Sequence, residues 1–167
     1  MLVDRKKKMK TDTSQCTKKW NYDKKKKIWS EGGEITDKRP PQILFIERCL
    51  QLLRDGGRMA IVLPDSIVGN KTDGYIREFI LSKAKLLAVV DCPIETFANH
   101  TKTSVLCLEK KSGKDEKEYL IFMAIAEKCG HDKRGKEIYK LNSKGEKIVD
   151  DDFPEIIEAY KKFKREK

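Results

Sequence analysis

Apolar residues recur at the spacing of an amphipathic helix in three stretches of the chain. The first covers residues 42–54, where Pro40-Pro41 stand at a position that tolerates proline and Asp55-Gly56-Gly57 end the helix. The second follows Asp73, its expected N-terminal cap, and the third begins at Pro154. The apolar faces consist of Ile43, Ile46, Leu50 and Leu53, then Tyr75, Ile76, Phe79, Ile80 and Ala84, and finally Ile156, Ile157, Tyr160 and Phe163.

Short apolar runs between these helices predict strands, and the first of them, R-M-A-I-V-L, is typical of a buried parallel strand. A turn at 142–145 predicts a β-hairpin between 138–141 and 147–149. Because strands alternate with amphipathic helices, the fold class is expected to be α/β, with helices layered on a sheet. The expected strands are residues 58–63, 86–90, 103–108 and 119–125.

Residues 1–38 are polar and show no sustained periodicity, so we expect a basic arm or loop there. Residues 1–40 hold 13 basic and 6 acidic residues, a net charge of +7 out of +10 for the whole chain. Trp20, Tyr22 and Trp29 are interleaved with the lysines. Lysines neutralise phosphates and aromatic rings stack on bases, which points to nucleic acid. An arm whose tryptophans dock on the rest of the chain fits the pattern equally well.

The composition narrows the functional classes. The length of 167 residues suits one domain, and the 38% of charged residues exclude a chain that is all core. Five scattered cysteines without a C-x-x-C pair predict reduced thiols, and neither histidine has metal-ligand spacing, so no metal site is expected. No apolar run is long enough to cross a bilayer and no secretory signal is visible, so the expected location is cytoplasmic, without membrane contact.

Few residues carry visible chemistry. The sequence contains no G-x-G-x-x-G, no P-loop and no G-x-S-x-G elbow. Asp65 and Asp91 each follow a predicted strand, at the edge where open α/β sheets bind ligands. Aspartates at strand ends are also common turn formers, and the pattern alone favours that structural role. The basic segment 131–136 can contact phosphate, although a solvated hairpin tip is the simpler interpretation.

Two central blocks, PPQILFIERCL at 40–50 and GRMAIVLPD at 57–65, resemble the N6-adenine DNA methylases, and in particular the modification subunit of type I restriction-modification systems. The resemblance covers residues 18–165. It continues at residues 75–78, 87–90, 95–97, 102–106, 130–136 and 152–156.

The resemblance implies a Rossmann-like sheet with one late antiparallel strand. Members of the family bind S-adenosylmethionine with a glycine-rich loop and hold a flipped adenine with an Asn/Asp-Pro-Pro-aromatic motif. Neither motif is present, since Pro40-Pro41 lack both the polar and the aromatic partner and match the family's helix-opening prolines.

We therefore expect residues 39–167 to be the C-terminal half of a methylase domain, with late strands, flanking helices, a hairpin and a C-terminal helix. Such a fragment would contain no cofactor site and would be inactive alone. The alternative is a non-catalytic module that binds DNA or another subunit.

The resemblance also implies where the target base would lie. Phe97 matches a loop whose aromatic residue stacks on the extruded base in related enzymes, although a core plug is nearly as good an interpretation. Pro64 and Asp65 would border the same pocket, and Asn99, His100 and Thr101 lie in the loop beside it. No catalytic, cofactor-binding or metal-binding residue is expected. The candidate DNA contacts are Lys24, Lys25, Lys26, Lys102, Lys133 and Arg134.

The same resemblance predicts the partners. In the family the fourth strand lies beside the fifth, so a chain without the fourth strand presents residues 58–63 as an unpaired apolar edge. We expect DNA as one partner. At the edge we expect the N-terminal half of the methylase or a second copy of this chain, and other restriction-modification subunits are further expected partners.

Overall fold

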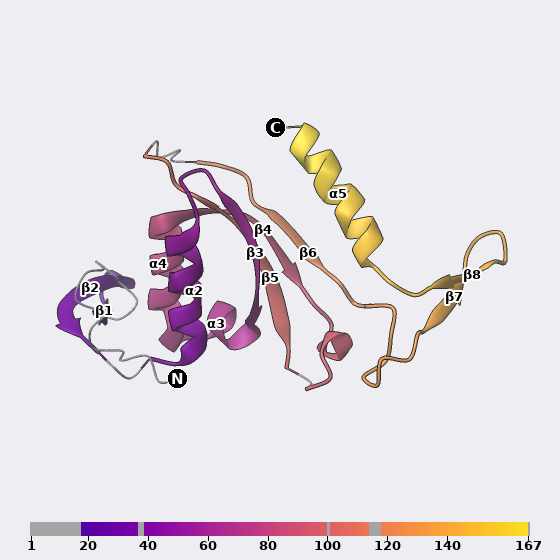
Figure 1. The fold of residues 1–167 in the computed structure, drawn as a ribbon, viewed down its shortest axis with the longest axis horizontal. Coiled ribbons are helices and arrows are strands. Elements are labelled where there is room, and N and C mark those ends of the chain that lie inside the picture. Colours follow the sequence, from indigo (N-terminus) through magenta and orange to yellow (C-terminus); the bar gives the residue numbers. More distant parts are fainter. Residues whose placement is uncertain (1–17, 37–38, 100, 114–117, 167) are drawn as a thin grey trace.

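The computed structural model describes residues 18–36, 39–99, 101–113 and 118–166. Its centre is a four-stranded mixed sheet in the order β3-β5-β4-β6, with α2 and α4 on one face and α5 on the other (Figure 1). The α/β class predicted from the sequence is thereby confirmed. The sheet consists of β3 (Arg58–Pro64), β4 (Ala84–Asp91), β5 (Thr103–Lys110) and β6 (Phe122–Ile125).

Strand β5 runs antiparallel to both of its neighbours, β3 and β4, while β4 and β6 are parallel. One antiparallel strand inserted late in the sequence agrees with the sheet that the resemblance implied. The prediction that residues 58–63 form a buried parallel strand is wrong in two respects. Within the described residues, β3 pairs only with the antiparallel β5, and its Val62 side chain is 48% exposed.

The core lies between the sheet and the helices α2 (Pro41–Leu52) and α4 (Gly74–Lys83). Cross-strand partners share a face of the sheet, so Ile61 and its partner Leu106 both point toward these helices. Leu108 and Ile76 are fully buried in the same layer. The helical spacing predicted from the sequence is therefore the pattern that builds the core. Asp73 stands at the N-cap of α4 as expected, but its side chain makes no capping hydrogen bond.

The opposite face of the sheet is covered only in part. Helix α5 (Phe153–Arg165) packs its Tyr160 and Phe163 rings on Phe122 of β6, with ring centroids 5.2 and 5.6 Å apart. No residue of α5 is fully buried, so this helix rests on the sheet through a narrow contact.

Sequence patterning missed the five-residue helix α3 (Asp65–Gly69). The predicted C-terminal hairpin is confirmed as β7 (Tyr139–Leu141) and β8 (Lys147–Val149). The described helices are all too short or too polar to cross a membrane.

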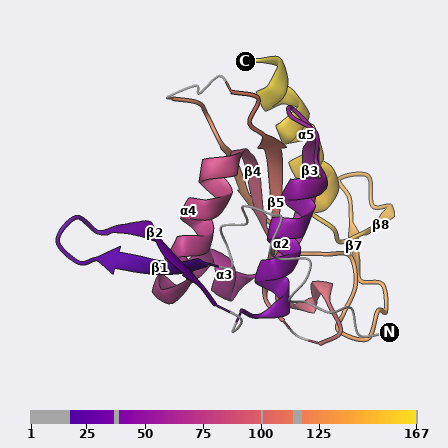
Figure 2. The ribbon, with the colours of Figure 1, turned by 60° about the vertical axis from the view of Figure 1, so that its left-hand side comes forward.

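A second hairpin stands on the outer side of the helices. Strands β1 (Lys18–Asp23) and β2 (Ile28–Ile35) pair antiparallel and project away from α4 (Figures 1 and 2). The segment expected as a basic arm or loop is thus a regular β-hairpin in its described part, and Gly32-Gly33 lie inside β2. Residues 1–17 lie outside the described part of the chain.

The hairpin is fixed by aromatic packing on helix α4. The rings of Trp20 and Trp29 lie 6.2 and 5.7 Å from the ring of Tyr75, centroid to centroid. The Arg39 guanidinium also stacks on the Tyr75 ring, 4.3 Å from its centroid. The same guanidinium donates a hydrogen bond to the Lys18 carbonyl at 2.8 Å. Gly74 makes the approach possible, because a Cβ there would lie 2.3 Å from Nε1 of Trp29. The docked-arm interpretation of the tryptophans is thus the one the structure supports.

Substituting Gly74→Ala is therefore expected to displace the Trp29 indole and loosen the hairpin without unfolding the sheet. Overpacking of this kind lowers the free energy of unfolding by roughly 1–3 kcal/mol. Removing a glycine from a helix raises it by at most about 1 kcal/mol, so the net effect is destabilising. Amide exchange should accelerate in residues 18–35 and stay unchanged in β5. Gly33→Ala is the matched control, because no atom lies within 4 Å of a Cβ built there. Unchanged exchange in the hairpin of Gly74→Ala would contradict the docking.

Candidate functional site

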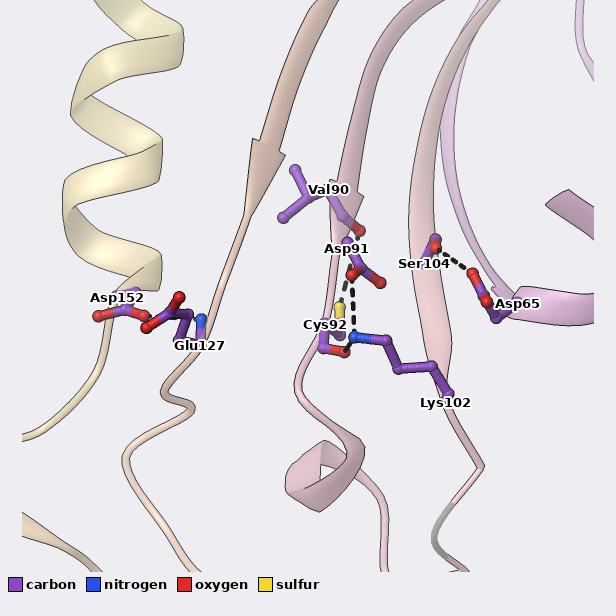
Figure 3. A network of polar contacts seen from close by, with 8 residues as sticks. All are labelled: Asp65, Val90, Asp91, Cys92, Lys102, Ser104, Glu127 and Asp152. Atoms are coloured by element: carbon purple, nitrogen blue, oxygen red, sulfur yellow. Dashed lines mark hydrogen bonds and ion pairs between the residues drawn. The ribbon is translucent and has the colours of Figure 1, made fainter. Parts of the chain in front are cut away.

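The carboxyl ends of β3 and β4 meet the beginning of β5 at one edge of the sheet (Figure 3). Both strands run antiparallel to β5, so they point in the same direction and end side by side with it. The Asp65 amide donates to the Lys102 carbonyl at 2.9 Å, and the Cys92 amide donates to the Thr103 carbonyl at 3.0 Å. The sequence argument that Asp65 and Asp91 lie at a common edge is therefore confirmed.

An ion pair closes the loop that connects β4 to β5. Nζ of Lys102 lies 2.9 Å from Oδ2 of Asp91 and donates a hydrogen bond to the Cys92 carbonyl at 2.8 Å (Figure 3). Asp91 Oδ1 is buried and has no hydrogen-bond partner among the described residues. Lys102, singled out from the sequence as a DNA contact, thus joins the two ends of the loop. Asp91 is the partner that sequence reasoning did not assign to it.

Asp65 forms a separate and weaker contact at the same edge. Ser104 is buried, and its hydroxyl donates to Oδ1 of Asp65 at 3.5 Å. Asp65 itself is exposed at the first position of α3, and Pro64 before it is half-buried. The carboxylate of Asp65 therefore faces solvent beside a buried hydroxyl. Ser104 was missed in the sequence because a serine inside an apolar strand carries no signal of its own.

Cys92 lies beside the ion pair but is not a reactive thiol. Its side chain is buried, and burial raises the pKa of the thiol above its ordinary value. A raised pKa keeps the group protonated at neutral pH, whereas the thiolate is the nucleophile and metal ligand. No cluster of three metal-ligating side chains occurs among the residues that the structure describes. The edge is thus built from hydrogen bonds and one ion pair.

The loop between β4 and β5 presents two apolar side chains to solvent. Ile94 is 43% exposed and Phe97 is 40% exposed, and neither belongs to the core cluster. The core-plug interpretation of Phe97 is therefore not supported. Asn99 turns the end of the loop by accepting a hydrogen bond from the Thr101 amide at 3.2 Å, and His100 lies outside the described residues. An exposed aromatic ring next to a strand end is available for contact with a flat ligand.

The other basic candidates lie elsewhere. Lys24, Lys25 and Lys26 form the tip of the β1–β2 hairpin, on the far side of the helices from the sheet (Figure 1). Lys133 and Arg134 are exposed in a turn between β6 and β7. The structure thus unites Pro64, Asp65, Phe97 and Lys102 at or beside one edge and separates them from the basic tip of the β1–β2 hairpin.

Two aspartates outside the edge hold backbone amides in place. Asp132 accepts hydrogen bonds from the amides of Lys136 and Arg134, which lower the pKa of its carboxyl. Asp152 accepts from the amides of Lys128 and Glu127, both at 2.8 Å, and these hydrogen bonds lower the pKa of its carboxyl. Figure 3 shows Asp152 beside Glu127. Asp152 thus ties the start of α5 to the segment after β6. The sequence pattern predicted a helix that begins at Pro154, but it did not indicate this distant contact.

Comparison with known proteins places the chain in a family. The sequence profile described as N-6 DNA Methylase matches residues 11–167. A search of curated proteins found no match. Among solved structures, a protein of Listeria monocytogenes assigned to the class I S-adenosylmethionine-dependent methyltransferases shows 21% identity and a TM-score of 0.47. That similarity covers 56% of this chain and 30% of the Listeria protein. On the profile match, which extends over nearly the whole sequence, this chain belongs to the N-6 DNA methylase family.

Proposed function

We propose that the chain is the C-terminal part of an S-adenosylmethionine-dependent adenine-N6 DNA methyltransferase domain, in the modification subunit of a type I restriction-modification system. In this proposal it contributes a wall of the target-base pocket and contacts to DNA, and it is inactive without the polypeptide that carries the catalytic motif. Family membership supports the reaction class, and the sequence blocks around residues 40–65 support the type I assignment.

The observation that carries the proposal is the open edge of β3. In the described residues β3 is hydrogen-bonded on one side only, by β5. Charges or prolines inside an edge strand are the usual means of blocking further pairing. In β3 they occur only at the two ends, as Arg58 and Pro64, and the stretch from Met59 to Leu63 contains neither. The family's fourth strand, which precedes the catalytic motif in the missing half, would pair with this edge. Its carboxyl end would then lie beside Pro64 and Asp65.

The residues present do not fit the methyl donor. The family's glycine-rich loop has no counterpart in the sequence, and the Asp91 carboxylate at the sheet edge is occupied by Lys102. We therefore assign no donor-binding residue in this chain and derive no step through the donor. In the proposal, S-adenosylmethionine binds the N-terminal half.

The contribution of this chain is to receive the flipped adenine. Phe97 offers an exposed ring for stacking, and Pro64 with Asp65 borders the same edge. Lys102 acts as a positioning residue, because its bonds to Asp91 and to the Cys92 carbonyl fix the loop that carries Phe97. A loop held at both ends loses little conformational entropy when it meets the base.

The first test is methyl transfer to duplex DNA, followed with radiolabelled S-adenosylmethionine. The chain alone is expected to transfer nothing. The chain mixed with an N-terminal methylase half that carries the glycine-rich loop and the Asn-Pro-Pro-aromatic motif is expected to label adenine. Robust transfer by the chain alone would refute the assignment of the catalytic motif to another polypeptide. A stable complex that stays inactive would contradict the proposed function.

The second test concerns Phe97 in that complemented enzyme. Stacking on an aromatic ring is worth roughly 1–3 kcal/mol per base, so Phe97→Ala should weaken capture of the flipped adenine about 5- to 150-fold. A fluorescent 2-aminopurine at the target position reports the capture directly. Ile94→Ala is the matched control, because Ile94 is equally exposed in the same loop but offers no ring. Equal effects of the two substitutions would exclude stacking by Phe97.

A further inference from the structure

Four consecutive lysines, Lys24–Lys27, occupy the tip of the β1–β2 hairpin, and all four are exposed. None of them forms an ion pair with a described residue, whereas Lys18 and Lys19 at the base of the hairpin are paired with Glu31 and Glu34. The hairpin therefore separates its charges. Its base is neutralised, and its tip keeps an unbalanced positive charge.

The one acidic residue next to the tip serves the turn. Oδ1 of Asp23 accepts hydrogen bonds from the amides of Lys25 and Lys26 at 2.8 and 3.1 Å. Lys27 adopts a left-handed backbone with φ of 56°, a conformation that non-glycine residues adopt rarely. The turn thus has a defined backbone shape, and all four of its residues are exposed lysines.

The tip is also held at a fixed place on the protein. Trp29 packs on Gly74 and Tyr75, and Arg39 bridges Tyr75 to the Lys18 carbonyl. These contacts leave the tip standing clear of the helices (Figure 2). Charges on an anchored element need less ordering on binding than charges on a flexible arm, so more of their attraction is retained as affinity.

The anchoring uses the rings that could otherwise stack on bases. Trp20 and Trp29 are engaged with Tyr75, and Tyr22 lies against Trp29 with ring centroids 5.0 Å apart. Tyr22 is 46% exposed but already packs on Trp29, so the four lysines of the tip offer a ligand chiefly positive charge. Such a surface recognises phosphates and carries no information about base sequence.

We propose that the β1–β2 hairpin is a phosphate-binding arm, which places Lys24–Lys27 on the backbone of duplex DNA and reads no bases. The inference rests on the proposed function, because it takes DNA as the partner. It adds that the contact lies on the opposite side of the helices from the base pocket. The arm would therefore hold DNA outside the target site and contribute affinity that is independent of sequence.

The test is the salt dependence of DNA binding by the full chain, measured by fluorescence anisotropy. The variant Lys24→Gln, Lys25→Gln, Lys26→Gln leaves Lys27 in its left-handed conformation and removes three charges. Each lost phosphate contact lowers the slope of log affinity against log salt concentration by about 0.9, so the slope should fall by about 2 to 3. The loss should be the same for two duplexes of unrelated sequence.

The matched control is Lys83→Gln, Lys144→Gln, Lys161→Gln, which makes the same change in net charge at exposed sites on α4, the β7–β8 turn and α5. Its slope should stay close to that of the unchanged chain. Equal salt slopes for both triple variants would refute the phosphate-binding arm. A decrease in slope that is seen with only one of the two duplex sequences would refute it too. A loss seen on vesicles of phosphatidylserine and phosphatidylcholine but not on DNA would also overturn it.

These outcomes are separable from the proposed function. If the tip variant keeps its salt slope while the complemented enzyme still methylates adenine, the arm is refuted and the proposed function stands. If the tip variant shows the predicted decrease in salt slope while the complemented enzyme remains inactive, the arm is supported as a DNA contact and the methyltransferase assignment is refuted.

Discussion

The hydrogen bonds of β5 are the interaction on which the sheet depends. This strand pairs along its whole length with β3 on one side and β4 on the other, and β6 joins only through β4. Because β5 is antiparallel to both neighbours, the carboxyl ends of β3 and β4 arrive together at its first residues. That arrangement brings Lys102 to Asp91 and Ser104 to Asp65. The same pairing leaves β3 as an edge strand with half of its backbone groups available.

Uncovered apolar side chains lie at both edges of the sheet. Val62 of β3 is 48% exposed, and Met123 and Ile125 of β6 are more than 70% exposed on the face that α2 and α4 cover elsewhere. Phe45 and Leu52 point away from the core on α2. Surfaces of this kind are typical of interaction sites. They are consistent with a chain that completes its sheet with another polypeptide, as the proposed function requires.

The sequence predicted the elements whose patterning is local. Helix α2, strands β3 and β5 and the β7–β8 hairpin follow from periodicity and turn residues, and so does the meeting of Asp65 and Asp91 at one edge. The β1–β2 hairpin was not predictable in this manner, because its stability comes from Tyr75 and Gly74, about 45 residues further along the chain. The pairing of Lys102 with Asp91 and the hydrogen bonds from the amides of Glu127 and Lys128 to Asp152 also join distant residues, which a single sequence does not reveal.

The most direct test of the open edge is amide hydrogen exchange in residues 58–64, measured on the chain alone and in complex with an N-terminal methylase half. If a strand of that half pairs with β3, the amides that point away from β5 should exchange at least about tenfold more slowly in the complex, since each gains a backbone hydrogen bond. Exchange in β5 should change little. A stable complex in which residues 58–64 exchange as fast as in the chain alone would contradict the account.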